Sequence, residues 1–459
     1  MRQLSELWMM AADWSKAMEL NQLKETVKQS GIVGAGGAGF PTYMKLDTRA
    51  EIILMNCAEC EPLLKLHQQL LRDKAYEIMK TFALLAETVQ AKQAIIGIKK
   101  SYTETIDALN VYLKDFPGME LHLLPEAYPM GDEVVLIYEA TGRVIRPGGL
   151  PIEEGVAVFN VETVYNIYRA LEVQMPVVEK YVTIVGEVET PTTVCVPIGM
   201  SIRETVAKAG NITTKEPVYL LGGPMMGRIG SPEEPVTKTT NAVIVLPKDH
   251  LIVQRKNRSA SLDMKRAASS CCQCQMCTDL CPRHLLGHPI EPHKFMRSAA
   301  NKDFQDIQVF LDTMFCSSCG LCEMFSCPQG LSPRSLIADY KAGLRKAGVK
   351  PPADVVAAPV SSAREYRKAP EARLEARLGL YKYHRPAPIH HEVETAGQVK
   401  ILLSQHIGAP AVPVVKKGDK VVKGQMIASP AEGLSVAIHA SIDGTVTETA
   451  DRFIVIANA

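Results

Sequence analysis

The sequence has no long apolar run and almost no net charge. Nowhere do about eighteen apolar residues follow one another, so no membrane-spanning helix is predicted. The 51 Lys and Arg residues nearly balance the 50 Asp and Glu residues, which leaves a formal net charge of +1. The chain therefore lacks the excess of positive charge that is typical of nucleic-acid-binding proteins. The opening residues, MRQLSELWMMAADWSK, lack both a continuous apolar stretch and a small-residue cleavage site, so export is not expected.

The remaining composition is that of an ordinary globular protein, with 46% hydrophobic and 22% charged residues. A chain of 459 residues exceeds what one hydrophobic core serves, so roughly three or four domains are expected. The 12 cysteines in a chain without an export signal favour a reducing compartment. We therefore expect a cytoplasmic, multidomain protein.

Eight of the cysteines lie in two short runs that each end in Cys-Pro. They are Cys271, Cys274, Cys277 and Cys281 in the first run, and Cys316, Cys319, Cys322 and Cys327 in the second. The first run has the spacing of bacterial ferredoxins, and the second has one additional residue before its last cysteine. Because a cubane cluster needs four converging thiolates, the pattern predicts two 4Fe–4S clusters. Zinc sites with four cysteines are the alternative, since paired Cys-x2-Cys motifs also bind zinc.

In ferredoxins with two clusters, the fourth cysteine of each run binds the other cluster. Under that rule Cys327 would complete the first set of three ligands, and Cys281 would complete the second. The additional residue in the second run leaves this crossing open. Cys272 lies beside a ligand and is expected to be spare.

Pattern and composition divide the chain into six segments. An amphipathic helix is expected over 1–30, and alternating strands and helices over 31–179 predict an α/β domain with a mostly parallel sheet. Residues 180–250 are β-rich around a short helical run, which favours a β-grasp-like (SLBB-like) module. Residues 251–350 are expected to be helical around the cysteine runs, as in ferredoxin-like domains with two clusters. A Pro-, Ala- and Arg-rich linker over 351–395 precedes a module of short strands over 396–459.

The two ends of the chain carry secondary signals. The apolar residues of the first segment fall near helical spacing, which is typical of a helix that caps a domain or docks on a shell or partner protein. They are Leu4, Leu7, Trp8, Ala11, Trp14 and Met18. The last segment resembles the barrel-sandwich modules of biotinyl and lipoyl carriers. Its stretch over 435–439 has no lysine, so a structural role is expected instead of a swinging cofactor arm.

A glycine-rich loop at 34–39 satisfies the pattern G-x-G-x-x-G, which by itself is weak evidence for a dinucleotide fold. The preceding residues NQLKETVKQS are polar and helix-like, whereas the dinucleotide fingerprint requires a preceding strand. The glycines still allow backbone to approach a phosphate or a ring closely. Phe40 adds an aromatic face, and Lys45 adds a cation. A purely structural turn is the alternative.

The stretches GAGGAGFPTYMK, NCAECEP, YPMGDEVVLIYEATGRVIRPGGLP and NVETVYNIYRA resemble the flavin-binding, NADH-oxidising subunit of respiratory complex I. They are still more similar to the RnfC protein of the Rnf electron-transport complex, and the likeness covers roughly 31–335. The resemblance implies a Rossmann-like domain that binds FMN with NADH stacked on its ring, and no catalytic residue beyond the cofactors. The residues implied around FMN are Gly34, Gly36, Gly37, Lys45, Asn56, Glu59, Tyr128, Gly131, Asp132, Glu133 and Asn160, with Phe40 and Glu61 on the nucleotide side. A redox disulfide between Cys57 and Cys60 is the rival interpretation of one of these turns.

The order of the segments separates this chain from RnfC, which carries its barrel-sandwich module before the flavin domain. Here that module comes last, and this order resembles the cobalamin reductases of the propanediol-utilisation microcompartment. The nearest match to a corrinoid-binding motif, His284 to Gly287, has Pro282 where Asp is required. The resemblance therefore implies cobalamin as a docked electron acceptor, an adenosyltransferase and a shell protein as partners, and a location inside a bacterial microcompartment.

A hydride donor delivers two electrons at once, whereas an iron–sulfur cluster accepts one. A flavin converts between the two, which is the physical reason for a flavin site and clusters to share one chain. Our hypothesis is that NADH reduces FMN, that single electrons pass to the clusters, and that cobalamin is reduced from Co(III) to Co(II) and on to Co(I). The alternatives are an Rnf-type peripheral subunit that feeds a membrane ion pump, and a scaffold without enzymatic activity.

Overall fold

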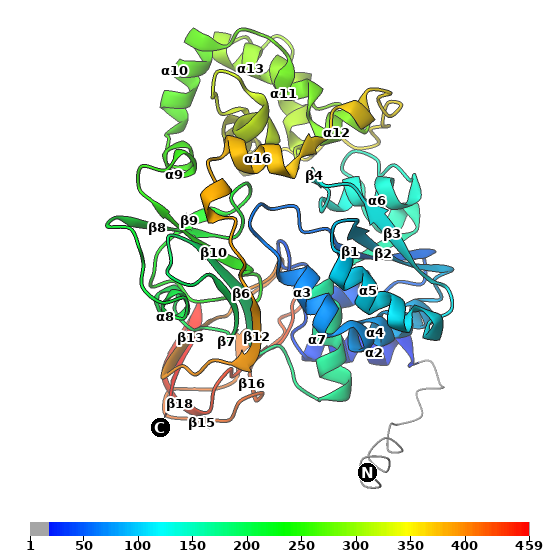
Figure 1. Cartoon of the computed structure of the whole chain (residues 1–459), viewed down its shortest axis with the longest axis vertical. Coiled ribbons are helices and arrows are strands. Elements are labelled where there is room, and N and C mark those ends of the chain that lie inside the picture. The colour runs from blue at the N-terminus through cyan, green and yellow to red at the C-terminus, as the bar shows by residue number, and fades with distance from the viewer. Residues whose placement is uncertain (1–17, 459) are drawn as a thin grey trace.

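A computed structural model describes residues 18–458 of the chain. Most of the amphipathic helix expected over 1–30 lies outside these residues, and the first described helix is α2 (Leu20–Gln29). In Figure 1 the helices of the cysteine-rich region lie at the top, the N-terminal α/β domain lies below them on the right, and a large β-sheet lies on the left. No helix within 18–458 combines the length and the apolar character that a membrane crossing requires.

The N-terminal domain is built on four parallel strands in the order β3-β2-β1-β5. The strands are β1 (Ile52–Cys57), β2 (Gln93–Lys99), β3 (Met119–Leu124) and β5 (Val156–Asn160). The helices are α3 (Leu66–Asp73), α4 (Ala75–Val89), α5 (Thr103–Tyr112), α6 (Glu133–Thr141) and α7 (Val161–Glu172). Helices α2, α3, α4, α5 and α7 share one core with one face of the sheet, and α6 packs on the other face. The domain is therefore doubly wound, as expected for a Rossmann-like fold.

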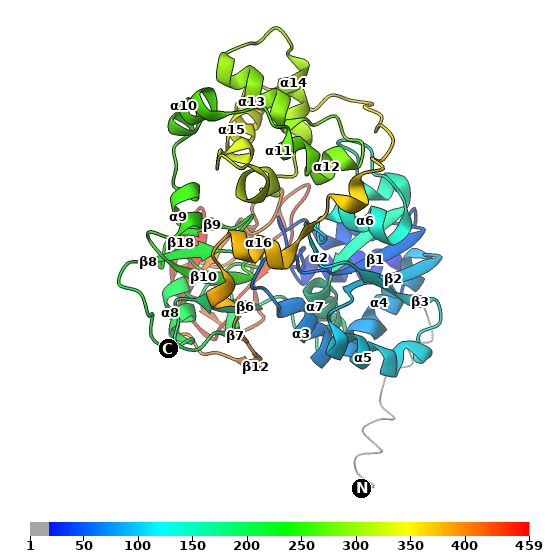
Figure 2. The same cartoon turned by 45° about the horizontal axis from the view of Figure 1, so that its top comes forward.

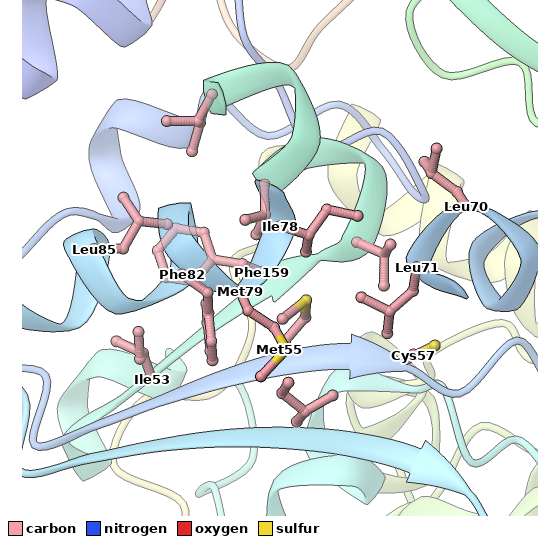
Figure 3. Close-up of a cluster of buried hydrophobic side chains, with 14 of the residues drawn as sticks. Ile53, Met55, Cys57, Leu70, Leu71, Ile78, Met79, Phe82, Leu85 and Phe159 are labelled. Carbon is pink, nitrogen blue, oxygen red and sulfur yellow. The ribbon is translucent and has the colours of Figure 1, made fainter. Parts of the chain in front are cut away.

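The main core of this domain forms because one helix face and one sheet face are both apolar. Along α4, residues spaced by three or four positions, including Ile78, Phe82 and Leu85, are fully buried, as helical periodicity requires. Figure 3 shows Phe82 beside Met55 of β1 and Phe159 of β5. Burial of such side chains contributes about 1.5–3 kcal/mol each. This core holds β1 and β5 side by side, and both strands end at the site described below.

A six-stranded sheet follows, in the order β12-β7-β6-β10-β8-β9. Its strands are β6 (Glu179–Gly186), β7 (Thr192–Pro197), β8 (Pro217–Leu221), β9 (Arg228–Gly230), β10 (Ala242–Pro247) and β12 (Ile389–Val393), with helix α8 (Ile202–Ala207) between β7 and β8. The sheet matches the expected β-rich module except for β12. That strand comes from the segment 351–395, which was expected to be a linker, and pairs in parallel with β7.

Short helices make up the cysteine-rich region. They are α9 (Leu251–Lys256), α10 (Ala260–Ser270), α11 (Met276–Asp279), α12 (Pro282–Leu285), α13 (Pro292–Asn301), α14 (Gln308–Leu311) and α15 (Pro333–Lys346). Figure 2 shows α10, α13, α14 and α15 grouped at the top, away from the sheet of the N-terminal domain. Their shared core includes Phe295 and Leu336, together with Cys327 of the second run.

The segment 351–395 packs across the molecule. Its strand β11 (Ala369–Pro370) pairs with β4 (Ala127–Tyr128) of the N-terminal domain, and helix α16 (Glu371–Arg377) follows directly. Helix α16 lies between the cysteine-rich region and the two domains below (Figures 1 and 2). Leu374 and Leu378 are fully buried there, which gives a Pro-rich segment an apolar anchor.

The C-terminal module consists of two small sheets, in the orders β13-β19-β18-β15 and β14-β16-β17. Its strands are β13 (Gln398–Leu402), β14 (Val412–Pro413), β15 (Lys420–Val421), β16 (Met426–Ser429), β17 (Ile438–His439), β18 (Gly444–Ala450) and β19 (Phe453–Ala457). Its core is continuous with that of the six-stranded sheet through Ile401, Ile456 and Val196. The stretch 435–439, where carriers present a modified lysine, is buried.

Candidate functional site: a pocket beside the cysteine runs

The carboxyl ends of β1 and β5 meet where the sheet reverses its strand order. The chain passes from β1 through β2 to β3 on one side and returns with β5 on the other side of β1. Open α/β sheets bind ligands at such a switch point. Asn56 near the end of β1 and Asn160 at the end of β5 are register partners, and a pocket of about 300 Å³ opens beside them. It is lined by Gly34, Gly36, Gly37, Ala38, Gly39, Phe40, Thr42, Lys45, Asn56, Gly131, Glu133, Val158, Phe159, Asn160 and Thr163.

A lysine and a glutamate face each other in the pocket. The Nζ of Lys45 donates to Oε1 of Glu133 at 3.0 Å and to the main-chain oxygen of Val158 at 2.8 Å. The two side chains are 26% and 40% exposed. Water therefore screens the pair, which contributes about 1 kcal/mol or less. Both groups are available to a polar ligand at little energetic cost.

The glycine loop brings bare backbone to the pocket. It follows helix α2 instead of a strand, so the ordinary dinucleotide fingerprint does not apply. A Cβ on Gly36 would lie 2.7 Å from Nδ2 of Asn160, whereas a Cβ on Gly37 would meet nothing within 4 Å. Gly36 therefore permits close packing, and Gly37 leaves open space for a ligand.

The N-terminus of α7 is fastened to this loop. The side chain of Asn160 caps the helix and accepts the backbone N–H of Glu162 at 2.9 Å, and Thr163 Oγ1 accepts the N–H of Ala35 at 3.0 Å. A helix N-terminus carries partial positive charge and favours anions. The arrangement suits a ligand with a phosphate group.

Nine of the thirteen residues that the sequence analysis assigns to the flavin and nucleotide line this one pocket. They are Gly34, Gly36, Gly37, Phe40, Lys45, Asn56, Gly131, Glu133 and Asn160. The other four, Glu59, Glu61, Tyr128 and Asp132, are absent from its lining. Each of the four has a defined partner elsewhere.

Glu59 is a buried carboxylate behind the pocket. Its oxygens accept backbone N–H groups from the first turn of α3, at 3.1 Å from Leu66 and 2.6 Å from His67. Burial raises the pKa of Glu59 to about 7, although these hydrogen bonds and nearby Lys99 favour the ionised form. Burial also lowers the pKa of His67 to about 3, so its imidazole is neutral near pH 7.

Glu61 joins three parts of the chain. Its carboxylate accepts the backbone N–H groups of Met225 and Met226, both at 2.8 Å, from the turn after β8. Lys256 of α9 donates to the main-chain oxygen of Met225 at 3.1 Å in the same turn. Burial raises the pKa of Glu61. In this structure Glu61 holds domains together and does not reach the pocket.

Tyr128 and Asp132 connect the pocket to the cysteine runs. The Tyr128 hydroxyl donates to the main-chain oxygen of Cys319 at 2.5 Å, and burial raises the pKa of that hydroxyl. Nη2 of Arg283 donates to both oxygens of the Asp132 carboxylate, each at 2.9 Å. Arg283 follows Cys281 by two positions. Both contacts lie within five residues of Gly131 and Glu133, so the pocket wall and the cysteine runs are linked directly.

The structure also adds residues that the sequence analysis left out. Thr42 and Thr163 line the pocket, and a buried pair of Lys180 and Glu162 lies beneath the loop, where Lys180 also donates to the main-chain oxygen of Ala35 at 3.3 Å. Thr163 and Glu162 belong to the Asn-Val-Glu-Thr motif and could have been found there. Lys180 lies in a different segment and carries no such signal.

The thiols of Cys57 and Cys60 are both free. The Sγ of Cys60 accepts the backbone N–H of Gly131 at 3.3 Å. Burial raises the pKa of Cys60 to about 12 and that of Cys57 well above its ordinary value. Because reactive thiols have low pKa values, these environments argue against a redox disulfide.

The cysteines of the two runs affect one another's pKa mainly within two sets of four. One set is Cys271, Cys274, Cys277 and Cys327, and the other is Cys281, Cys316, Cys319 and Cys322. Burial, together with the nearby Cys327, Cys271 and Cys274, raises the pKa of Cys277 to about 12. In the other set, burial raises the pKa of Cys319, which Cys281 and Cys316 raise further, and the pKa of Cys322 is raised by burial, Cys316 and Cys319. The grouping agrees with the crossed assignment, although the ligand role of each cysteine stays a prediction. Cys277 also acts on Cys322, so the two sets are neighbours.

A π-helical turn, η6 (Cys322–Ser326), accommodates the additional residue of the second run. Such turns take one more residue per turn than an α-helix and frequently occur at functional sites. The turn lets Cys327 lie near Cys277 despite the longer spacing. This explains how two runs of unequal length form matching sets.

The two sets differ in burial. In the set that includes Cys281, the buried cysteines are Cys319 and Cys322. In the other set Cys327 is buried and Cys274 is exposed, as is the neighbouring Cys272, which belongs to neither set. Within 18–458, no three His, Cys, Asp or Glu side chains come together as a site for a single metal ion. Eight thiols in two neighbouring sets provide the donor type and number that two cubane clusters require, so the residues fit such groups.

Four family models match the chain. Residues 27–169 match the Nuo51 FMN-binding domain, 181–229 the SLBB domain, 270–332 a 4Fe-4S dicluster domain, and 382–458 the RnfC barrel sandwich hybrid domain. These matches confirm the expected domain types, and they support FMN and iron–sulfur clusters as the cofactors.

Two relatives match along nearly the whole chain. Cobalamin reductase PduS of Salmonella typhimurium is 42% identical over 447 residues, which are 96% of this chain and 97% of the relative. Cobalamin reductase PduS of Citrobacter freundii is 41% identical over 449 residues, 96% and 98% of the two chains. Among solved structures, an NAD+-reducing NiFe-hydrogenase in its H2-reduced state is 20% identical with a TM-score of 0.47, and the match covers 74% of this chain and 64% of that one.

Proposed function

The chain belongs to the cobalamin reductase PduS family, and from this premise we propose that it uses NADH to reduce cobalamin, from Co(III) to Co(II) and on to Co(I). The observation that carries the proposal is the direct linkage of the switch-point pocket to the cysteine runs within one chain. Tyr128 donates to Cys319, and Asp132 pairs with Arg283.

The pocket would hold FMN. The N-terminus of α7, the glycine loop and Lys45 would receive its phosphate and polar edge, and Asn56, Glu133 and Asn160 would supply further donors and acceptors. Phe40 would offer an apolar face to a ring. Bound FMN would supply the conversion from a two-electron donor to one-electron acceptors. The chain's own contribution is to bind the flavin, orient it and fix its distance from the cysteine runs.

The cysteine runs would hold two 4Fe–4S clusters in the crossed arrangement. Cys271, Cys274, Cys277 and Cys327 would bind one cluster, and Cys316, Cys319, Cys322 and Cys281 the other. The second set lies toward the flavin domain, because Tyr128 contacts Cys319 and Arg283 follows Cys281. The first set includes the exposed Cys274. A set near the flavin with no exposed cysteine, and a second set with one exposed cysteine, suit electrons that enter at one end and leave at the other.

The family favours cobalamin over a membrane ion pump as the destination of the electrons. Cob(I)alamin is a strong reductant, so a partner that consumes it at once would draw the reduction forward. We propose an adenosyltransferase as that partner, a microcompartment shell protein as a second one, and the interior of a propanediol-utilisation microcompartment as the location.

The test compares two electron donors in pocket variants of the anaerobically purified chain. Lys45→Ala and Glu133→Ala should lower NADH-dependent reduction of cob(III)alamin at least tenfold, whereas dithionite should still reduce the clusters to wild-type EPR intensity. Lys114→Ala, in the exposed turn η3 (Leu113–Asp115), serves as the matched control. Full NADH-dependent activity in both pocket variants, or wild-type protein without flavin and iron, would refute the proposal.

A further inference from the structure

Lys238 is a buried lysine in the connection between β9 and β10, outside the flavin pocket. Its side chain is 2% exposed. Its Nζ donates to the main-chain oxygen of Gly31 at 2.6 Å and to that of Ala437 at 3.0 Å. No carboxylate among the described residues forms an ion pair with it. Burial lowers the pKa of Lys238 to about 7. A buried amino group depends on its hydrogen-bond acceptors whether it is charged or neutral, so Lys238 fixes these two carbonyl groups.

The two acceptors belong to parts of the chain that are far apart in sequence. Gly31 ends the turn after α2 and leads into the glycine loop, and Ala437 belongs to the buried stretch of the C-terminal module. The N–H of Ala437 also donates to the main-chain oxygen of Lys28 at 3.2 Å. The C-terminal module is thereby attached at the start of the loop.

The same module holds the far end of the loop. The N–H of Ile407 donates to the main-chain oxygen of Gly39 at 3.2 Å. A Cβ on Gly39 would lie 2.9 Å from the main-chain oxygen of Gln405, so the two backbones are in close contact. The loop that lines the pocket is therefore held at both ends by a module that supplies no residue to the pocket lining.

Gln405 closes the network. Its Oε1 accepts the backbone N–H of Lys238 at 2.9 Å, and its Nε2 donates to the main-chain oxygen of Leu402 at 2.9 Å. Gln405 is 6% exposed. One polar network thus joins the β-rich module, the C-terminal module and the glycine loop.

We propose that Lys238, supported by Gln405, is a positioning residue for the flavin site, and that the C-terminal barrel-sandwich module acts as a brace for the glycine loop. The proposal rests on the proposed function in one respect, since it takes FMN as the ligand of the pocket. It explains why the stretch 435–439 lacks the lysine of a carrier. That stretch faces inward, against Lys28 and Lys238, and is unable to present a cofactor arm to solvent.

The experiment measures FMN affinity of the full chain after removal of flavin. Lys238→Met retains the apolar stem and removes the amino group. Gln405→Leu removes the hydrogen bond to the Lys238 backbone with little change in volume. Lys208→Met is the control, because Lys208 lies in the same β-rich module but pairs with Glu394 near the surface. FMN fluorescence quenching gives the dissociation constant, and hydrogen exchange of the amides over 32–40 gives the stability of the loop.

Loss of the buried hydrogen bonds of Lys238 predicts about tenfold weaker FMN binding in Lys238→Met, with a smaller loss in Gln405→Leu. Exchange over 32–40 should rise in both variants, while exchange in β2 and the iron content stay at wild-type levels. FMN affinity within twofold of wild type in Gln405→Leu and in any folded Lys238→Met would overturn the proposal. So would a general rise of exchange that includes β2. Wild-type protein that binds no FMN would instead refute the flavin site itself.

Discussion

The ion pair between Asp132 and Arg283 provides a quantitative test of the link between the flavin domain and the cysteine runs. Both Asp132 oxygens lie 2.9 Å from Nη2 of Arg283, and the two side chains are only 12% and 16% exposed. Breaking a fully buried pair costs about 3–5 kcal/mol. Since this pair retains some contact with water, we expect Asp132→Asn to lower the local stability of the folded protein by about 2 kcal/mol.

The same carboxylate also caps helix α6, and the two roles are separable. Oδ1 accepts the N–H groups of Val134 and Val135 at 3.1 and 3.2 Å. Asn caps a helix about as well as Asp, whereas Ala loses the cap at a cost of about 1 kcal/mol. Asp132→Asn should therefore remove the ion pair alone. Asp132→Ala should remove both contributions, about 3 kcal/mol in total.

Hydrogen exchange of the α6 amides in the full chain is the measurement. A loss of 2 kcal/mol corresponds to about thirtyfold faster exchange, and Asp132→Ala should exceed Asp132→Asn by about a further fivefold. Arg283→Met should match Asp132→Asn, and the double variant should be little worse than either single variant. Equal exchange in Asp132→Asn and wild type would show that the pair contributes nothing. An altered FMN affinity in Asp132→Asn would show that Asp132 contributes to the flavin site after all.

Three further outcomes are expected. Cys274→Ser should lose about half of the iron in anaerobic metal analysis and Cys272→Ser none, because only Cys274 belongs to a proposed cluster set. Equal losses in the two variants would contradict the ligand assignment. Glu59→Gln should become more stable relative to wild type as the pH rises from about 4.5 to 7. The pKa of Glu59 is about 7 in the folded state, so ionisation of Glu59 opposes folding over that range. Parallel pH dependences of the unfolding temperature in the two proteins would refute this prediction. Gly39→Ala should weaken FMN binding severely, since its φ of +72° and the Gln405 oxygen 2.9 Å from the new Cβ both disfavour a side chain; unchanged FMN titration would contradict the close contact.

The sequence predicted those features that depend on short motifs. Asn56 and Asn160 come at the ends of apolar strands, and parallel strands that neighbour each other place such residues at one edge of a sheet. The glycine loop and the cysteine runs are likewise local patterns. Because each motif carries its chemistry in consecutive residues, the pocket lining was largely recognisable before the fold was known.

Contacts between distant segments were not predictable in this way. Glu61 and Met225 are separated by 164 positions, and Tyr128 and Cys319 by 191. No local signal reveals that the side chains of Glu61 and Tyr128 turn toward another domain. A motif shared with flavoproteins therefore led to the prediction that they contact the ligand. Strand β12 escaped detection for a related reason: its residues after Ile389 are exposed, so it lacks the apolar pattern of a buried strand.

The packing of segment 351–395 explains how the last module of the chain reaches the glycine loop near its beginning. Lys99 of β2 is buried and pairs with Glu371 at 2.5 Å, and β11 is paired with β4 beside Tyr128. The segment thus crosses the junction between flavin domain and cysteine runs before it adds β12 to the six-stranded sheet. About 45 residues with an extended reach of roughly 3.3 Å each span the molecule easily. A module placed last in the chain can therefore reach a loop near its beginning, and its position in space, against Gly31 and Gly39, matters more than its position in the sequence.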